Sequence, residues 1–145
     1  MAAQLHTEGR KWMFEVSFTE EQSIPANFYV GLCTDTSIAE NAALSDLGEL
    51  TSTDYERQTL ASSTADWTSG ATGTNDRKMT SDTATFEVVS SGVTWTKAES
   101  WFLATTIDDS GKLIASGPLN SGSGWTLDFS PGNSTLNLDI EFVWP

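Results

Sequence analysis

The stretch STLNLDIEFVWP, residues 134–145, closes the sequence and carries its most regular apolar pattern. Apolar side chains occupy every second position from Leu136 to Trp144, and most of the positions between them are polar or acidic. Successive side chains of an extended chain point to opposite faces, so this alternation gathers apolar groups on one face. Pro145 has no N–H to donate to a neighbouring strand and therefore ends the segment. We predict a terminal strand that crosses a hydrophobic core.

The composition favours one all-β domain. A chain of 145 residues is long enough to bury a real core. The helix-forming residues Leu, Lys and Arg are sparse, whereas Ser, Thr and Gly are abundant. Short strands joined by turns of small residues are typical of such a composition. The sequence therefore predicts a single domain over residues 1–145, a jelly-roll-like β-sandwich of about eight strands.

Apolar segments separated by turn residues place the other strands. The last two expected strands are joined by a turn at residues 130–133, and Asp108–Gly111 is expected to close a hairpin. In the strand before that hairpin, Trp101, Leu103 and Ile107 are expected on one face. The strands are expected at residues 28–32, 55–60, 83–89, 93–96, 100–107, 112–119 and 125–129.

Two segments remain ambiguous from periodicity. Within the N-terminal segment, residues 1–25, the aromatic residues alternate as in a strand, but Thr7 is also placed to cap a short helix with Trp12 and Val16 on one side. Residues 34–54 form a long, mostly polar connection with a weakly apolar middle. A connection of this length is a functional loop, a packed flap or a disordered segment.

Charge excludes two classes of partner. Twenty acidic residues against seven basic ones give a net charge of −13. A nucleic-acid-binding protein needs a cationic face to displace counterions, and an anionic membrane surface repels this charge. We therefore expect neither nucleic acid nor membrane as a partner. An acidic surface suits docking on a basic patch of another protein. The N-terminal residues lack an apolar signal region, so we expect the chain to fold in a cytosol.

The titratable residues predict no catalytic group, metal or cofactor. His6 is the single histidine and is expected to be solvated in a mobile N-terminal arm, away from any nucleophile. Cys33 is expected to be a small buried group, so a zinc site lacks its usual ligands. Asp108 and Asp109 fit turn chemistry, and Arg57 fits a structural ion pair with a nearby carboxylate.

The acidic and aromatic residues also allow two functional hypotheses as alternatives to a purely structural role. Glycosidases use two carboxylates at a fixed separation, and Asp139 with Glu141 is a candidate pair, although so acidic a chain forms such pairs by chance. Most Trp residues lie in alternating segments and are expected in the core. Trp67, in a polar loop, and Trp95, between threonines, are less constrained and are candidates for stacking on a sugar.

Three stretches, taken in order, resemble a recurring structural protein of tailed bacteriophages. They are FYVGLCTD at 28–35, LGELTSTDYERQTL at 47–60 and SWFLATTIDDSGKLIASGPL at 100–119. The shared features are a Tyr-x-Arg-Gln strand at 55–58 and a Gly-Pro-Leu strand end at 117–119. The N-terminal segment is typically helical in this family, which tips residues 7–18 towards helix.

The resemblance implies a virion structural protein with a β-sandwich body and no catalytic residues. Members are described as capsid cement (decoration) proteins or as tail-fibre-like proteins. The leading hypothesis is therefore a cement protein made in the bacterial cytoplasm, which binds the major capsid protein on the virion and forms a dimer or trimer. A tail component that binds a host glycan is the alternative, and a hydrolase is a third. The expected partner contacts are Leu5, Trp12, Phe14, Trp67 and Trp95.

Overall fold

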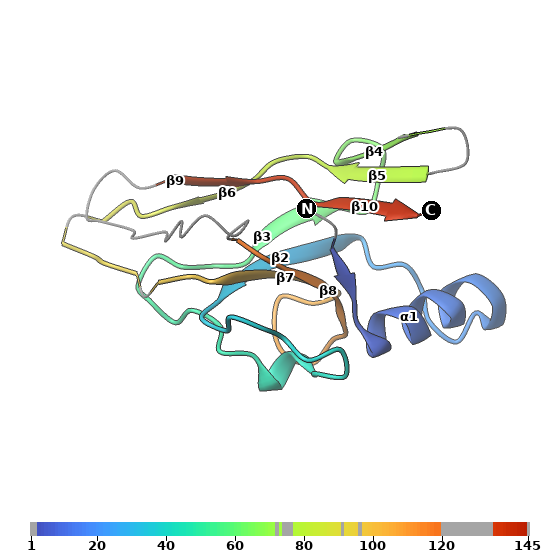
Figure 1. The fold of residues 1–145 in the computed structure, drawn as a ribbon, viewed down its shortest axis with the longest axis horizontal. Coiled ribbons are helices and arrows are strands. Elements are labelled where there is room, and N and C mark those ends of the chain that lie inside the picture. Colours follow the sequence, from blue (N-terminus) through green and yellow to red (C-terminus); the bar gives the residue numbers. More distant parts are fainter. Residues whose placement is uncertain are drawn as a thin grey trace.

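The computed structural model describes residues 3–71, 73, 77–90, 92–95, 97–119 and 135–144. It is an all-β sandwich with one short N-terminal helix, as predicted (Figure 1). The helical elements are α1 (Thr7–Phe14), a π-helical turn η1 (Glu15–Thr19) and a 3₁₀ turn η2 (Leu44–Asp46). The strands are β1 (Gln4–Leu5), β2 (Asn27–Cys33), β3 (Gln58–Ala61), β4 (Trp67–Gly70), β5 (Arg77–Ser81), β6 (Ala84–Glu87), β7 (Ser100–Ala104), β8 (Leu113–Pro118), β9 (Thr135–Leu138) and β10 (Glu141–Trp144).

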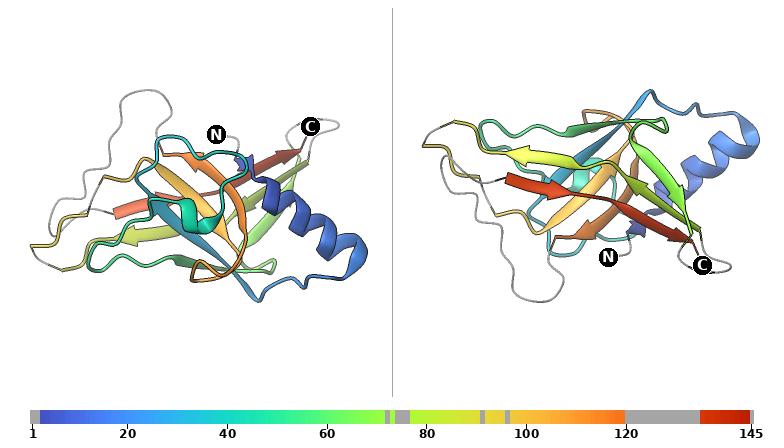
Figure 2. Two further views of the ribbon diagram at one scale, coloured as in Figure 1. Left: turned by 90° about the horizontal axis from the view of Figure 1, so that it is seen from below. Right: turned by 90° about the horizontal axis from the view of Figure 1, so that it is seen from above.

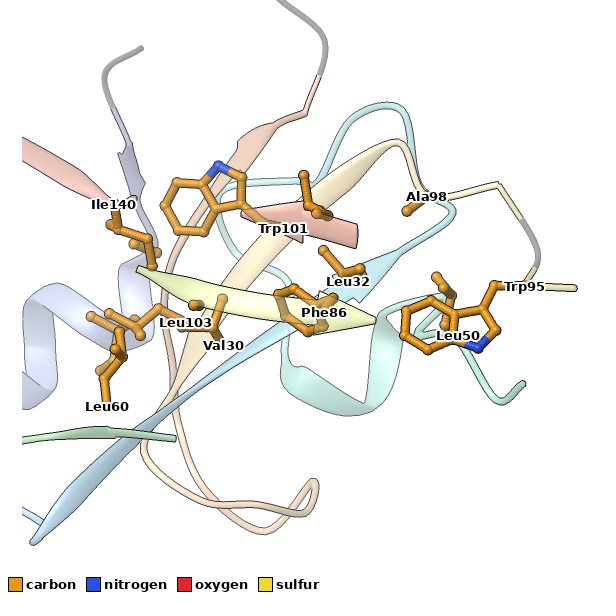
Figure 3. Packing of buried hydrophobic residues seen from close by; sticks show 14 of the residues in the cluster. Val30, Leu32, Leu50, Leu60, Phe86, Trp95, Ala98, Trp101, Leu103 and Ile140 are labelled. Atoms are coloured by element: carbon orange, nitrogen blue, oxygen red, sulfur yellow. The ribbon is translucent and has the colours of Figure 1, made fainter. Parts of the chain in front are cut away.

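Two layers of antiparallel strands enclose the core. One layer is a five-stranded sheet in the order β1-β8-β7-β2-β3. The other layer consists of a three-stranded sheet, β10-β5-β4, and a two-stranded sheet, β6-β9. The chain passes directly from β5 to β6 and from β9 to β10, so the two sheets are joined end to end. Figure 1 shows the two layers side by side, and the two views of Figure 2 look onto the five-stranded sheet (left) and onto the other layer (right). Side chains from both layers meet in Figure 3, where Phe86 and Ile140 lie against Val30 and Leu103.

The terminal stretch contributes two strands instead of the single strand predicted. β9 pairs with β6 and β10 pairs with β5, and the register shifts by one residue between the two pairs. Three residues on one side, 81–83, face two on the other, Asp139 and Ile140, which is a β-bulge that bends the ribbon. The predicted apolar face persists through the bend, because Leu136 and Ile140 are buried and Leu138 and Phe142 pack against them.

The segment 34–54 is a packed flap, which was one of three alternatives. Its Ile38 and Leu44 are buried with Phe102 and Leu113 in a second apolar cluster. This cluster covers the face of the five-stranded sheet that points away from the sandwich interior. All five residues of β7 are consequently buried, because both of its faces are covered.

Helix α1 lies against β8 and settles the ambiguity of the N-terminal segment in favour of helix. The predicted cap is wrong by one residue: Thr7 is the first helical residue and His6 is the cap, with no side-chain capping bond. The Thr7 N–H instead donates to the Glu40 carbonyl, 2.9 Å away, so the flap takes over the capping role.

Several strand boundaries differ from the prediction. Tyr55–Arg57 precede β3, Val93–Trp95 form no strand, and β7 ends at Ala104, which leaves Ile107 exposed. The predicted hairpin is confirmed, since β7 and β8 pair antiparallel across the turn. β4 and β5 lie in or beside a stretch expected to be a loop, because a Ser/Thr-rich strand has little apolar alternation. The strand expected at 125–129, the turn at 130–133 and Pro145 lie outside the described residues.

Candidate binding groove

The described part of the molecule carries an apolar groove of about 690 Å³. Its lining residues come from α1 and η1, from both sheets and from the loops beside them. Figure 1 shows α1 and the three-stranded sheet at the same end of the sandwich. Leu103 and Ile114 of the five-stranded sheet contribute to its lining, together with Trp12, Trp67 and Phe142 from the surrounding elements. A volume in the range of roughly 300–1,000 Å³ is typical of ligand sites in proteins.

A chain of aromatic rings runs along this groove from the helix to the last strand. Trp12 meets Phe28 edge to face with ring centroids 5.8 Å apart, and Phe28 meets Trp67 in the same way at 6.2 Å. Trp67 then stacks on Phe142 at 6.2 Å. Such ring pairs contribute roughly 0.5–1.5 kcal/mol each beyond the apolar area they bury, so the groove has a stiff aromatic wall.

The groove contrasts with the rest of the surface in charge. None of the described residues that line it carries a charged side chain, although the chain as a whole has a net charge of −13. Two polar atoms of lining residues, Ser62 Oγ and Trp67 Nε1, are buried without a hydrogen-bond partner in the structure. Leaving such a group unpaired costs about 1–3 kcal/mol. The apolar, charge-free lining suits an apolar, uncharged guest.

The structure brings three of the five predicted contact residues together here. Leu5, Trp12 and Trp67 all line the groove, whereas Phe14 lies on the outer side of the helix, where it is 63% exposed. Trp95 lies elsewhere: it is 4% exposed, its Nε1 donates to the Thr53 carbonyl, and its ring belongs to the core. It offers no face for a sugar in this structure.

Sequence reasoning missed part of this surface. Phe18 and Ile24 are 78% and 62% exposed beside the helix, and Phe14 lies 6.1 Å from Phe18, centroid to centroid. Phe142, assigned to the core, also lines the groove. The signal available in the sequence was the excess of aromatic residues between positions 12 and 18, which a single short helix cannot bury.

A second hollow, of about 320 Å³, lies beside Arg57, whose side chain forms ion pairs with Glu49 and Asp109 in the lining. Arg57 is 7% exposed, and its guanidinium donates to both Glu49 oxygens, at 2.8 and 2.5 Å, and to Asp109 at 2.6 Å. It also donates to the carbonyls of Thr106 and Asp108. Burial disfavours its charge, but the bonds to the two carboxylates outweigh burial and raise the pKa of Arg57. The predicted structural ion pair is confirmed.

The remaining carboxylates singled out by the sequence also form hydrogen bonds or ion pairs within the fold. Asp108 Oδ1 accepts from the Ser110 hydroxyl and N–H, which lowers the pKa of Asp108 and confirms its turn role. Asp139 accepts from the Thr83 hydroxyl at 2.7 Å, and Glu141 pairs with Lys78 at 2.5 Å. Within the described ranges, no three His, Cys, Asp or Glu side chains gather as a metal site would require.

The prediction of a solvated His6 is wrong. His6 is fully buried, with Nδ1 3.2 Å from the Glu40 carbonyl and Nε2 2.7 Å from Ser116 Oγ. A carbonyl can only accept, so Nδ1 carries the proton and Nε2 accepts from the serine hydroxyl. The two residues of β1 pair with β8 and the His6 N–H donates to the Ile114 carbonyl, so the N-terminal segment is docked on β8. A terminal arm was expected because the sequence offers no apolar stripe before residue 12.

The burial of His6 predicts that the stability of the protein depends on pH. Burial lowers the pKa of His6 below 6.5, against the opposing effect of hydrogen bonds to flap carbonyls. As the pH falls below 6.5, the unfolded chain takes up a proton that the folded chain refuses, so the free energy of unfolding decreases. Urea midpoints measured from pH 7.5 to 5.0 should fall more steeply for the wild type than for His6→Gln, which does not titrate. Parallel curves for the two proteins would contradict this role.

The burial of Cys33 predicts that its thiol does not react in the native protein. The residue is fully buried in β2, as expected, and burial raises its pKa to about 12. Because the thiolate is the reactive form, its fraction at pH 8 is about a hundredfold or more below that of a free cysteine. Ellman's reagent should therefore leave the native protein unlabelled over an hour and release one equivalent in 8 M urea. Rapid native labelling would show that β2 is accessible.

Comparison with known proteins adds no relative: no family model matches the chain, and no curated protein matches it. No helix among the described residues is long and apolar enough to cross a membrane.

Proposed function

We propose that the protein is a non-enzymatic virion structural protein, a capsid cement protein that binds the major capsid protein and stabilises the shell. The observation that carries the proposal is the charge-free groove, whose lining includes the exposed apolar side chains of Met13, Ile24, Met79 and Val143. A contiguous exposed apolar patch is typical of a protein–protein interaction site. The three stretches that resemble phage structural proteins support the same class.

The proposed action is stabilisation by mass action. A subunit that binds the assembled shell, and not its dissociated parts, stabilises the assembly by about 2.7 kcal/mol per site when its concentration is a hundred times the dissociation constant. The net charge of −13 favours encounter with a basic patch on the shell, and the groove supplies the apolar contact.

Quantitative mass spectrometry of purified virions tests this function. Copies of this chain are compared with copies of the major capsid protein in the same particles. Near-equal abundance supports a cement protein on the shell. A few copies per particle would move the protein to the tail, and its absence from particles would overturn the proposal of a virion protein.

One observation favours the alternative, a tail component that binds a host glycan. The aromatic ring of Trp67 is half-buried in the groove, and the hydroxyl-bearing Ser62, Ser63 and Thr64 line the same site. A ring beside hydroxyls is suited to stacking and hydrogen bonding with a sugar. Tryptophan fluorescence titrated across a panel of host glycans tests this: quenching in the wild type that is lost in Trp67→Leu supports it, and an unchanged spectrum counts against it.

A further inference from the structure

We propose that the groove binds an extended, uncharged apolar segment of another polypeptide, which adds a strand to the open edge of β10. The inference rests on the proposed function only for the identity of the partner, the protein that this chain would coat. Its basis is the meeting, at one place, of an unpaired strand edge and an apolar groove.

β10 is an edge strand. Among the described residues it pairs with β5 on one side and with no strand on the other. Just before it, the carbonyl of Ile140 accepts from the Ser81 N–H at 2.9 Å, and its N–H donates to Ser81 Oγ at 2.9 Å. The N–H and C=O groups of successive residues point alternately to the two sides of a strand. The backbone N–H and C=O of Phe142 therefore point towards β5, as those of Ile140 do. Glu141 and Val143 therefore direct their N–H and C=O groups towards the open edge.

The groove begins at this same edge. Phe142 and Val143 line it on β10, and the short edge strand β1 lines it with Leu5. A strand added to β10 would point alternate side chains towards the groove, as in recognition by β-augmentation. Because no charged side chain lines the groove, the guest residues that enter it must be uncharged.

Other occupants fit these observations less well. A second copy of the chain would bring another 13 negative charges to the interface, and like charges oppose association. A lipid chain would fill the apolar volume but would leave the outward N–H and C=O groups of β10 without partners. An extended polypeptide satisfies both the groove and the edge.

Selection from a displayed library of random twelve-residue peptides tests the inference without knowledge of the partner. The peptides recovered on the wild-type protein should carry uncharged apolar residues at alternate positions. One of them, synthesised with a fluorescein label, then serves as the probe for dissociation constants by fluorescence anisotropy. Methylation of the peptide's backbone nitrogens at alternate positions should abolish binding in one frame and spare it in the other.

The matched protein variants are Val143→Pro and Val143→Thr. Proline at 143 removes an N–H that faces outward and is tolerated on an edge strand, so the fold is kept while strand addition is blocked. Threonine keeps the shape and the N–H. We expect Val143→Pro to bind about tenfold more weakly than Val143→Thr, because proline removes one hydrogen bond and leaves the peptide carbonyl opposite it without a donor. The comparison is between the two variants, since both alter a side chain that lines the groove. Near-ultraviolet circular dichroism checks that both variants fold, and Glu141→Pro replaces Val143→Pro if it does not.

Several outcomes would overturn the inference. They are recovery of no peptide above background, recovery of charged peptides or peptides with helical periodicity, and equal binding by Val143→Pro and Val143→Thr. Dimers in sedimentation velocity that disappear in Val143→Pro would assign the groove to a second copy instead. The peptide result is independent of virion abundance, so a chain that binds such peptides but is absent from virions retains this site while losing the proposed function.

Discussion

Replacing Arg57 with Met is expected to lower the free energy of unfolding by about 3–5 kcal/mol, because it leaves carboxylates and carbonyls without their buried cation. The total stability of a domain this size is about 5–15 kcal/mol, so the loss is a large part of it. Glu49 loses both of its hydrogen bonds to the guanidinium. The Thr106 carbonyl loses its bond from Arg57, and the Asp108 carbonyl keeps only the bond from the Thr106 hydroxyl.

The effect is large because Arg57 joins three parts of the fold. Glu49 belongs to the flap, and Asp109 lies in the turn between β7 and β8. The guanidinium also lies over the Phe102 ring, 5.0 Å from its centroid, which links it to the cluster beneath the flap. Tyr55 adds to the network, since its hydroxyl donates to Glu49 at 2.9 Å and accepts from the Leu32 N–H at 2.8 Å.

Urea unfolding followed by tryptophan fluorescence measures the loss. Arg57→Lys is the matched control: it keeps the charge but loses the planar fork that bonds both Glu49 oxygens, so it should lie between the wild type and Arg57→Met. The double variant Arg57→Met with Glu49→Gln should recover part of the loss, because the unpaired carboxylate is then neutral. A wild-type midpoint in Arg57→Met would mean that the flap is held by its apolar contacts alone.

The sandwich and its main hairpin were predictable because each rests on a strong local signal. Alternation marks β2 and the terminal ribbon, and Asp and Gly mark the turn after β7. The bulge at residues 81–83, opposite Asp139 and Ile140, was not predictable, since nothing in an alternating run shows where the partner strand inserts an extra residue. β4 was missed because Thr68, Ser69 and Gly70 carry no apolar alternation, and only pairing with β5 makes them a strand.

The candidate site was predictable in part of its residues but not in its geometry. Leu5, Trp12 and Trp67 were singled out because they were poorly explained by a core, and the structure places all three in one groove. Their convergence depends on long-range packing between the helix, β1 and β4, which no local pattern encodes. Trp95 lay in an equally ambiguous stretch, yet it packs edge to face on Tyr55 in the core. Composition alone does not separate these two tryptophans.

Gly9 is the residue on which the helical wall of the groove depends. A methyl group added at this position would lie 2.3 Å from the Ile114 carbonyl oxygen and 2.7 Å from its Cα, both backbone atoms of β8. The same carbonyl accepts the His6 N–H at 3.0 Å, so the close approach and the docking of the N-terminal segment share one atom. A glycine that weakens the helical pattern in the sequence is therefore what allows the helix to touch the sheet.

Gly9→Ala is accordingly expected to destabilise the protein even though alanine favours helix by about 1 kcal/mol over glycine. Overpacking against backbone costs about 1–3 kcal/mol, and relief requires α1 to move away from β8, which displaces Trp12 from the groove. The urea midpoint should fall, and the tryptophan emission should shift to the red. Gly70→Ala is the control, since no atom lies within 4 Å of its added methyl group. It should be neutral or stabilising by up to about 1 kcal/mol. Should Gly9→Ala instead prove as stable as Gly70→Ala, the helix does not approach β8 this closely, and the groove between them would have a different shape.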